Sequence, residues 1–279
     1  MKPDIIETLG SSVIQHGPHN NRIYLMKLSR LDMPAIIKEM ETLASKNKYT
    51  KIFCKTPSKF EQFFTPYNFK KEASIPGYFN GLTGLSFMSK FLSKDRENNP
   101  DGQEISSILS AARNKARKTD SPESPDKFII SQASEKDAPA LAAIYREVFA
   151  TYPFPIHDES YIRKTMGENI SYFKVSFDGK IIAVSSAEKD IEARAVEMTD
   201  FAVLPSARGN NIAVMLLDEM EKEAAAEKYI TFFTIARALS AGMNSTFAKK
   251  GYKYTGTAVN NTNISGKIES MNVWYKTAA

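Results

Sequence analysis

Residues 201–213, Phe201-Ala202-Val203-Leu204-Pro205-Ser206-Ala207-Arg208-Gly209-Asn210-Asn211-Ile212-Ala213, join an expected strand at 195–203 to an expected helix at 212–227. The N–H groups of a first helical turn have no partner within the helix and lie at the positive end of its dipole. Gly209 and the two asparagines tolerate left-handed backbone conformations, so successive amides can converge on one ligand. The stretch therefore predicts an anion site, suited to a pyrophosphate, with Arg208 as an added positive charge.

Further strands and helices are expected on both sides of this loop. Asp178-Gly179 is a strong signal for a tight hairpin between strands at 171–177 and 180–187. Hydrophobic periodicity predicts the other elements: helices at 138–149 and 243–249, and strands at 128–130, 229–235, 252–259 and 271–275.

The composition is that of a folded globular protein. Of the 279 residues, 42% are hydrophobic and 25% are charged, which is typical of a chain with a packed core. The single cysteine, Cys54, has no disulfide partner, and no Cys/His cluster offers zinc ligands. We therefore expect a cytoplasmic protein without a metal. No run of about 18 apolar residues occurs, so no membrane partner is expected.

Part of the net charge of +5 is concentrated in one basic run, Arg113, Lys115, Arg117 and Lys118. Such a run is either the solvated end of a helix or a patch that binds nucleic acid. One short run favours the helix end, so no nucleic-acid partner is expected. The sequence does not indicate the oligomeric state.

The chain divides at residues 119–126, where two prolines among small polar residues predict a linker. We expect an N-terminal α/β domain at 1–93, a helical connector and linker at 94–126, and a catalytic domain at 127–279. Glu39-Met40-Glu41 recurs 180 residues later as Glu219-Met220-Glu221, and Lys48-Tyr49 as Lys228-Tyr229. The first half is therefore either a degenerate repeat of the second, lacking its phosphate loop, or a chance match of two amphipathic helices.

The stretch 201–213 resembles the acetyl-CoA loop of the GNAT acetyltransferases, with Arg208 and Ala213 at matching positions and Asn211 where a glycine is usual. The resemblance covers about 127–279 and implies an α/β (α+β) fold, a mixed and mostly antiparallel sheet flanked by helices. With the echo at a 180-residue offset, it predicts a smaller, degenerate GNAT-like N-terminal domain. Acetyl-CoA would be the cosubstrate, held by Phe201, Ala202, Val203, Arg208, Gly209, Asn210, Asn211, Ile212, Ala213, Ser240 and Asn244.

One position departs from the family pattern. Phe247 aligns where many relatives have a tyrosine that protonates the leaving thiolate, and a phenyl ring cannot donate a proton. Water, Tyr252 or Tyr254 would have to supply that proton, or the thiolate would leave unassisted.

The whole chain resembles the β-lysine N-acetyltransferases, which make the compatible solute Nε-acetyl-β-lysine under salt stress. Distinctive strings in both halves carry this resemblance: 15–17, 22–26, 72–77, 197–202, 260–266 and 269–272. It implies β-lysine as the small-molecule amine substrate. A β-lysine pocket needs groups for a carboxylate and two amines, and the candidates are Tyr152, Asn260, Asn261, Asn263 and Glu269. The asparagine segment is alternatively a polar turn between the last two strands, and Tyr152 alternatively fills core.

The amine must lose a proton before it attacks, because an alkyl ammonium has a pKa of about 10.4. Glu197 and Asp200 are the candidate bases, and regular strand alternation would point them to opposite faces. Only one could then face the substrate unless the strand is bulged, and a bulged or splayed strand is what the family resemblance implies here. We favour Glu197, with Asp200 as the alternative. Other acceptors, such as another small amine or a protein amine, stay open, as does a non-catalytic module that binds acetyl-CoA or nucleic acid.

Overall fold

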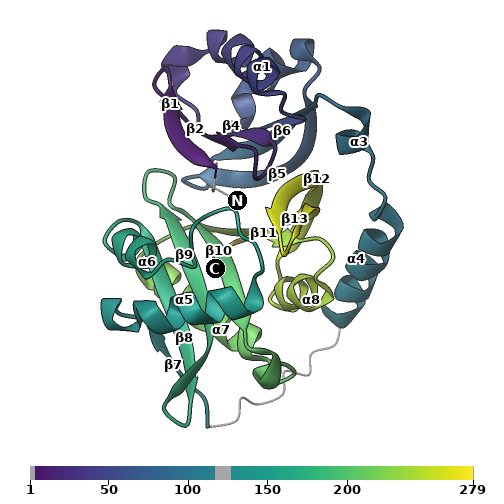
Figure 1. Cartoon of the computed structure of the whole chain (residues 1–279). Coiled ribbons are helices and arrows are strands. Elements are labelled where there is room, and N and C mark those ends of the chain that lie inside the picture. Colours follow the sequence, from purple (N-terminus) through teal and green to yellow (C-terminus); the bar gives the residue numbers. More distant parts are fainter. Residues whose placement is uncertain (1–3, 117–126, 279) are drawn as a thin grey trace.

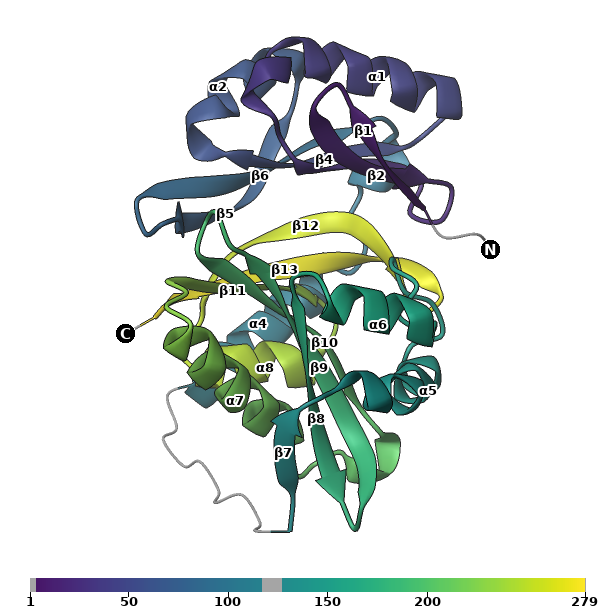
Figure 2. The same ribbon diagram turned by 90° about the vertical axis from the view of Figure 1, so that its left-hand side faces the viewer.

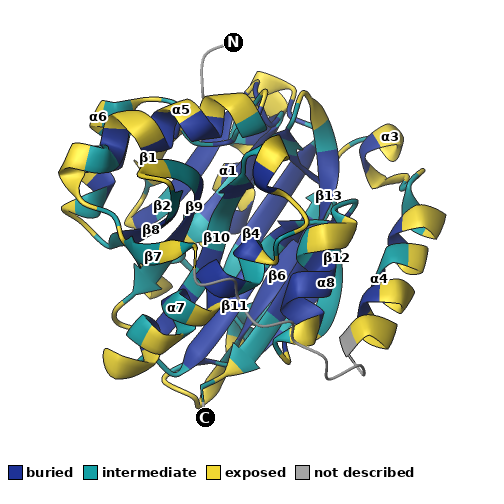
Figure 3. Ribbon diagram, turned by 90° about the horizontal axis from the view of Figure 1, so that it is seen from below, coloured by how far each residue is buried: buried dark blue, intermediate teal, exposed yellow. Residues whose placement is uncertain are grey.

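The computed structural model describes residues 4–116 and 127–278, which form two β-sheets, one in each half of the chain (Figure 1). The sheet of the first half lies across β12 and β13 of the second half (Figure 2). Most strand positions are buried or half-buried, whereas the outer faces of α4, α5 and α6 are exposed (Figure 3). Among these described residues, no helix is both long and apolar enough to cross a membrane.

The sheet of the second half has the strand order β12-β13-β11-β10-β9-β8-β7, in which β10 and β11 are parallel and the other neighbours antiparallel. Helices α5 and α6 pack on one face, and α7 and α8 on the other. This arrangement confirms the expected fold class, a mixed and mostly antiparallel sheet flanked by helices. The elements are β7 (Ile129–Gln132), α5 (Ala138–Val148), α6 (Glu159–Met166), β8 (Ile170–Phe177), β9 (Lys180–Asp190), β10 (Ala195–Val203), α7 (Ile212–Ala226), β11 (Thr231–Arg237), α8 (Ala241–Lys249), β12 (Lys253–Ile264) and β13 (Lys267–Thr277).

Local sequence signals fix several of these boundaries. The hairpin between β8 and β9 turns at Asp178 and Gly179, whose φ angles of 48° and 74° are those of the predicted tight turn. The strand at Ala195–Val203 is confirmed, and α7 begins at Ile212 as predicted. Helix α6 was not predicted, because eight mostly polar residues show too little apolar periodicity for a helix.

The sheet of the first half repeats part of this topology. Its order is β1-β2-β3-β4-β6-β5, with β3 and β4 parallel, which matches β8-β9-β10-β11-β13-β12. Strands β4 and β11 begin at Lys51 and Thr231, the same 180-residue offset as the sequence echo. The duplication and the domain limits 1–93, 94–126 and 127–279 stay predictions. The elements are β1 (Ile5–Leu9), β2 (Ser12–Gly17), β3 (Arg22–Lys27), α1 (Ala35–Asn47), β4 (Lys51–Pro57), α2 (Glu61–Phe64), β5 (Lys70–Phe79) and β6 (Thr83–Phe91).

Helices α3 (Lys94–Glu97) and α4 (Gly102–Ala116) follow β6 and lead away from the first sheet. Ile105, Leu109 and Ala112 of α4 are buried in the same cluster as Phe247 and Tyr252 of the second half. The connector helix is therefore part of the second half's packing. The predicted linker at 119–126, with Arg117 and Lys118, lies outside the described residues.

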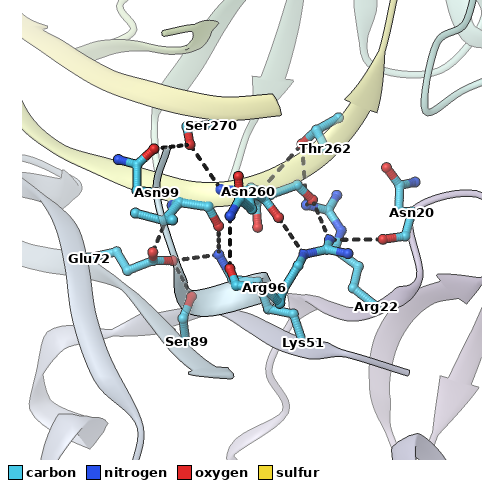
Figure 4. Close-up of polar contacts among 12 residues, drawn as sticks. Asn20, Arg22, Lys51, Glu72, Ser89, Arg96, Asn99, Asn260, Thr262 and Ser270 are labelled. Carbon is cyan, nitrogen blue, oxygen red and sulfur yellow. Dashed lines mark hydrogen bonds and ion pairs between the residues drawn. The ribbon is translucent and has the colours of Figure 1, made fainter. Parts of the chain in front are cut away.

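The two halves share one continuous interface. Phe53, Tyr78 and Phe87 of the first sheet belong to the same apolar cluster as Phe233 and Val273 of the second. A polar network lies beside this cluster, and in it basic side chains of the first half bind backbone carbonyls of β12 (Figure 4).

Residues 260–263 continue β12, which contradicts the alternative of a polar turn; the turn itself is at Ser265-Gly266. The physical reason is long-range. Register is irregular between Ala258 and Thr262, and the first half supplies hydrogen bonds along the irregular stretch.

Candidate active site

Strands β10 and β11 separate part-way along their length. They pair only from Ala195/Thr231 to Glu197/Phe233 within the described residues, although β10 continues to Val203 and β11 to Arg237. Beyond these pairs, the described backbone N–H and C=O groups of β10 and β11 that face each other form no β-sheet hydrogen bonds between the two strands. Such a gap offers N–H and C=O groups to an extended ligand that lies between the strands.

A bulge in β10 brings the two candidate bases to one side. Asp200 has a φ of 56°, and the pairing with β9 shifts register between Thr199 and Ala202. The Asp200 carboxylate accepts hydrogen bonds from the hydroxyls of Ser186 and Tyr152. Ser186 pairs with Thr199, on the same face as Glu197. The prediction of a bulged strand is confirmed. Because of the bulge, Asp200 lies on the same face of the strand as Glu197, rather than on the opposite face as regular alternation would place it.

A cavity of about 920 Å³ extends from the bulge to the N-terminus of α7. One end lies beside Tyr152, Thr199, Asp200, Ile264 and Met271. Residues of both separated strands line its middle, and the other end is formed by the loop before α7, by α8 and by Lys115 of the connector helix. The cavity therefore joins the predicted anion site to Asp200, one of the two predicted bases, whereas Glu197 is not among its lining residues.

The loop before α7 has the backbone that the sequence predicted. Gly209 and Asn211 have φ angles of 85° and 55°, and Asn211 immediately precedes the helix. Asn210 donates from its side-chain amide to the Ala207 carbonyl, and Arg208 to the Val203 carbonyl. The first-turn N–H groups of α7 thus lie at the cavity wall beside a positive side chain, which is the chemistry that binds phosphate.

Three carboxylates lie near one another where β10 and β11 separate. Glu188 of β9 and Glu197 of β10 are paired residues in the register, so their side chains lie on the same face. Burial and the neighbouring Glu188 carboxylate raise the pKa of Glu197 to about 8. Burial also raises the pKa of Glu188 and of Asp200, although the Ser186 and Tyr152 hydroxyls oppose the effect at Asp200. Such a cluster favours a cationic ligand or holds protons near neutral pH.

Comparison with known proteins agrees with this geometry. The model of the acetyltransferase (GNAT) family matches residues 140–252. A beta-lysine N(6)-acetyltransferase of Methanococcus maripaludis is 41% identical over 276 residues, 98% of each chain. The N-acetyltransferase YodP of Bacillus subtilis is 31% identical over 95% of this chain and 96% of its own, and a beta-lysine N(6)-acetyltransferase of Methanosarcina mazei is 38% identical over 54% and 56%.

The chain belongs to the GNAT family of acetyltransferases. It is an N-acetyltransferase, and its full-length similarity to two curated relatives includes the first half as well as the GNAT region.

Most of the predicted cofactor residues of this GNAT protein line the cavity: Phe201, Val203, Arg208, Gly209, Asn211, Ile212, Ala213 and Ser240. Ala202, Asn210 and Asn244 are not among the lining residues. The Asn244 amide instead donates to the carbonyls of Arg237, Ala238 and Ser240 and accepts from Asn272 and Trp274, so it fixes the start of α8.

Phe247 lines the cavity of the GNAT protein, with its ring centroid 5.7 Å from that of Phe201 and 5.1 Å from that of Tyr252. Neither Tyr252 nor Tyr254, the predicted alternative proton donors, is a lining residue. Among the described lining residues, Tyr152 is the one tyrosine, and its hydroxyl is bonded to Asp200.

The other predicted substrate residues lie beside the interface of the two halves. Asn260 donates to the carbonyls of Arg96 and Asn98, and Asn263 donates to Asn20 and His19. The carbonyl of Asn261 accepts from Arg22. Glu269 is buried in a two-bond ion pair with Arg237, a cavity residue. Of the predicted substrate residues, Tyr152 reaches the cavity directly.

Sequence reasoning missed Glu188 and the first-half residues that face the carboxylates. Glu188 directly follows the strand expected at 180–187, and a glutamate after an apolar run is usually solvated, so it gave no signal. Its position two residues after Ser186, on the same face, becomes informative only once the pairing of β9 with β10 is known.

Proposed function

We propose that this GNAT protein transfers the acetyl group of acetyl-CoA to the terminal amine of β-lysine, forming Nε-acetyl-β-lysine. The observation that carries the proposal is the cluster of three carboxylates, Glu188, Glu197 and Asp200, where β10 and β11 separate, which suits a small cationic acceptor. The names of the two beta-lysine N(6)-acetyltransferases support the same acceptor.

Acetyl-CoA fits the residues that are present. The cavity is long, runs from a helix N-terminus to the strand gap, and carries Arg208 and Lys115 at the predicted phosphate end. We propose that the α7 amides and Arg208 hold the pyrophosphate, and that unpaired backbone groups of β10 and β11 hold the pantetheine arm. When bound there, acetyl-CoA supplies the thioester.

Glu197 is the proposed base. A carboxylate with a pKa of about 8 accepts a proton from an ammonium far more readily than one at its ordinary value of 4.5. Asp200 is less suited, because hydroxyls of Ser186 and Tyr152 already occupy its oxygens. We propose that Asp200 fixes Tyr152 at the acceptor end and that Glu197 takes the proton, directly or through one water. Asn260, Asn261, Asn263 and Glu269 would then support the wall of the site through β12 and β13.

A role in making a compatible solute under salt stress, in the cytoplasm, is part of the same proposal. It follows from the proposed acceptor and is supported only through the similarity to the beta-lysine N(6)-acetyltransferases.

The test is turnover with a panel of acceptors: β-lysine, α-lysine, putrescine and a lysine-containing peptide, followed by thiol release and by NMR of the product. We expect β-lysine to exceed α-lysine at least about 10-fold in kcat/KM, because a misplaced amine leaves buried polar groups unsatisfied. The product should carry the acetyl group on the terminal nitrogen. Equal rates for putrescine and β-lysine would refute the amino-acid acceptor, and a preference for the peptide would place the enzyme among protein acetyltransferases. Absence of turnover with every amine would favour a binding module.

A further inference from the structure

The first half of the chain presents a second set of side chains to the carboxylates. Along β3 and β4 the side chains alternate between two faces. Ile23, Leu25, Ile52 and Cys54 point into the first half's own core around α1. Tyr24, Phe53 and Lys55 therefore lie on the opposite face, toward the second half. Phe53 and Tyr24 indeed pack in the apolar cluster that both halves share.

Lys55 lies near the point where β10 and β11 separate. Its ammonium is 5.6 Å from the ring centroid of Phe233 and 4.9 Å from that of Tyr78. Phe233 is the last residue of β11 that pairs with β10, and its partner is Glu197. The Tyr78 hydroxyl donates to Asp190 at 2.9 Å, two residues after Glu188 on the same face. Lys55 is thus a cation beside the row Glu188, Asp190 and Glu197.

Other cations on this interface have fixed partners. Lys51 binds Glu72 and the Val259 carbonyl, Arg22 binds the Asn261 carbonyl, and Arg96 binds the Asn260 carbonyl (Figure 4). Lys55, in contrast, forms no hydrogen bond or ion pair with any residue of 4–116 or 127–278. Its charge acts on Glu188 and Glu197 from a distance and partly offsets the rise of both pKa values.

The absence of a direct ion pair between Lys55 and these carboxylates is unusual for a partly buried lysine, because a paired buried charge has a lower free energy than an unpaired one. A ligand between Lys55 and the acids that carries both signs of charge would pair with each side. An amino-acid acceptor has this character: a carboxylate and a non-reacting ammonium at one end, and the reacting amine at the other.

We propose that the N-terminal half completes the acceptor site, with Lys55 binding the carboxylate of the substrate and Glu188 binding its second, non-reacting ammonium. The proposal rests on the proposed function and adds the groups that would distinguish an amino acid from a simple diamine. Glu197 then faces the reacting amine, nearer the cavity, since Thr199 lies two residues further along the same face and lines it. A GNAT region without its N-terminal half would lack the carboxylate partner.

The test is a matrix of two variants and three acceptors in the full-length enzyme. The acceptors are β-lysine, 6-aminohexanoate, which lacks the second amine, and putrescine, which lacks the carboxylate. Lys55→Met keeps the length and removes the charge, so kcat/KM should fall about 10- to 100-fold for β-lysine and 6-aminohexanoate but less than about 3-fold for putrescine. Glu188→Gln should lower the ratio of kcat/KM for β-lysine to kcat/KM for 6-aminohexanoate about 10- to 100-fold; the change that it also causes in the pKa of Glu197 affects both acceptors and cancels in this ratio. Most of each loss should appear in KM.

Lys59→Met is the matched control, because Lys59 is an exposed lysine four residues along the chain in the same half. Its kinetics should equal the wild type with all three acceptors. Lys55→Arg should recover part of the preference for carboxylates, which a purely structural role would not predict.

The outcomes separate the two proposals. In one outcome, the wild type prefers β-lysine while Lys55→Met either keeps that preference or shows an equal fall in kcat/KM for all three acceptors. The assignment of Lys55 is then wrong, while the proposed function stands. If the wild type does not accept β-lysine, the proposed function fails. The role of Lys55 is then tested by the ratio of kcat/KM for 6-aminohexanoate to kcat/KM for putrescine. If Lys55→Met leaves this ratio unchanged, the assignment of Lys55 is wrong as well.

Discussion

Replacement of Glu197 by glutamine should change activity and stability in opposite directions. Glutamine keeps the size and hydrogen-bonding shape of the side chain but accepts no proton at neutral pH. The wild-type carboxylate has its pKa raised to about 8 by burial and by Glu188. The kcat/KM of the wild type should therefore rise with pH and level off above about 8, as Glu197 becomes the base.

The expected loss of activity is about 10²-fold or more at pH 8, the usual contribution of a positioned base. At that pH only about 0.4% of an amine with a pKa of 10.4 is unprotonated. The activity left in Glu197→Gln should keep rising toward pH 10, as free amine accumulates, without the inflection near 8.

Stability should move the other way. A raised carboxyl pKa means that the folded state holds the proton of Glu197 more tightly than the unfolded state does. The protonated side chain therefore adds to the free energy of unfolding. This contribution is complete below pH 4.5 and is lost as the pH rises through about 8. The interval between these values corresponds to at most about 5 kcal/mol. Glu197→Gln avoids the buried charge and should unfold at a higher temperature than the wild type at pH 9, by an amount that disappears toward pH 5.

The assay is thiol release from pH 6.5 to 10 together with thermal unfolding at pH 5, 7 and 9. Glu192→Gln is the control, because the Glu192 side chain is 80% exposed and paired only with an exposed Lys27. An inflection near pH 8 that survives in Glu197→Gln would place the base elsewhere, with Asp200→Asn as the next variant. A variant that loses activity without gaining stability at pH 9 would contradict the raised pKa.

Three further changes test the rest of the site. Tyr152→Phe removes the hydroxyl that donates to Asp200 and should lower kcat/KM about 10-fold; a change below 2-fold in steady-state kinetics would count against its role. Gly209→Val places a β-branched residue at a φ of 85° and should abolish most of the thermal stabilisation by acetyl-CoA, whereas an undiminished shift would locate the phosphate site elsewhere. Lys115→Ala should weaken CoA binding about 3- to 10-fold in low salt and less in high salt, measured by calorimetry; equal affinity at both ionic strengths would exclude a phosphate contact.

Periodicity predicted much of the second half because its strands and helices have strong local signals. The strand at Ala195–Val203, the hairpin at Asp178-Gly179 and the start of α7 follow from alternation and turn chemistry. Residues 260–263 show where this fails. Three asparagines among polar neighbours favour a turn locally, yet hydrogen bonds from residues more than 150 positions away hold them in β12.

The candidate site was predicted where its residues are close in sequence and missed where they are not. The phosphate loop is one continuous segment, so its glycine, asparagines and arginine could be identified together. The bulge at Asp200 required family knowledge, because alternation alone puts Asp200 opposite Glu197. Lys55 comes near Glu188 only through the packing of one half on the other, and no local pattern in either strand indicates this proximity.

The shared topology gives this packing a physical explanation. Lys55 of β4 occupies the position that Ile235 occupies in β11, since both strands begin 180 residues apart, and Ile235 lines the cavity. In the first half, β3 and β4 stay paired through Leu25/Cys54, one pair further than β10 and β11, and a short 3₁₀ helix at Arg30–Asp32 stands in place of a phosphate loop. The first half therefore lacks the phosphate loop, and its parallel strands separate less than those of the second half. The face that would line such a gap is instead free to carry Tyr24 and Lys55 against the neighbouring half, which is how a degenerate repeat can supply acceptor specificity rather than a second catalytic site.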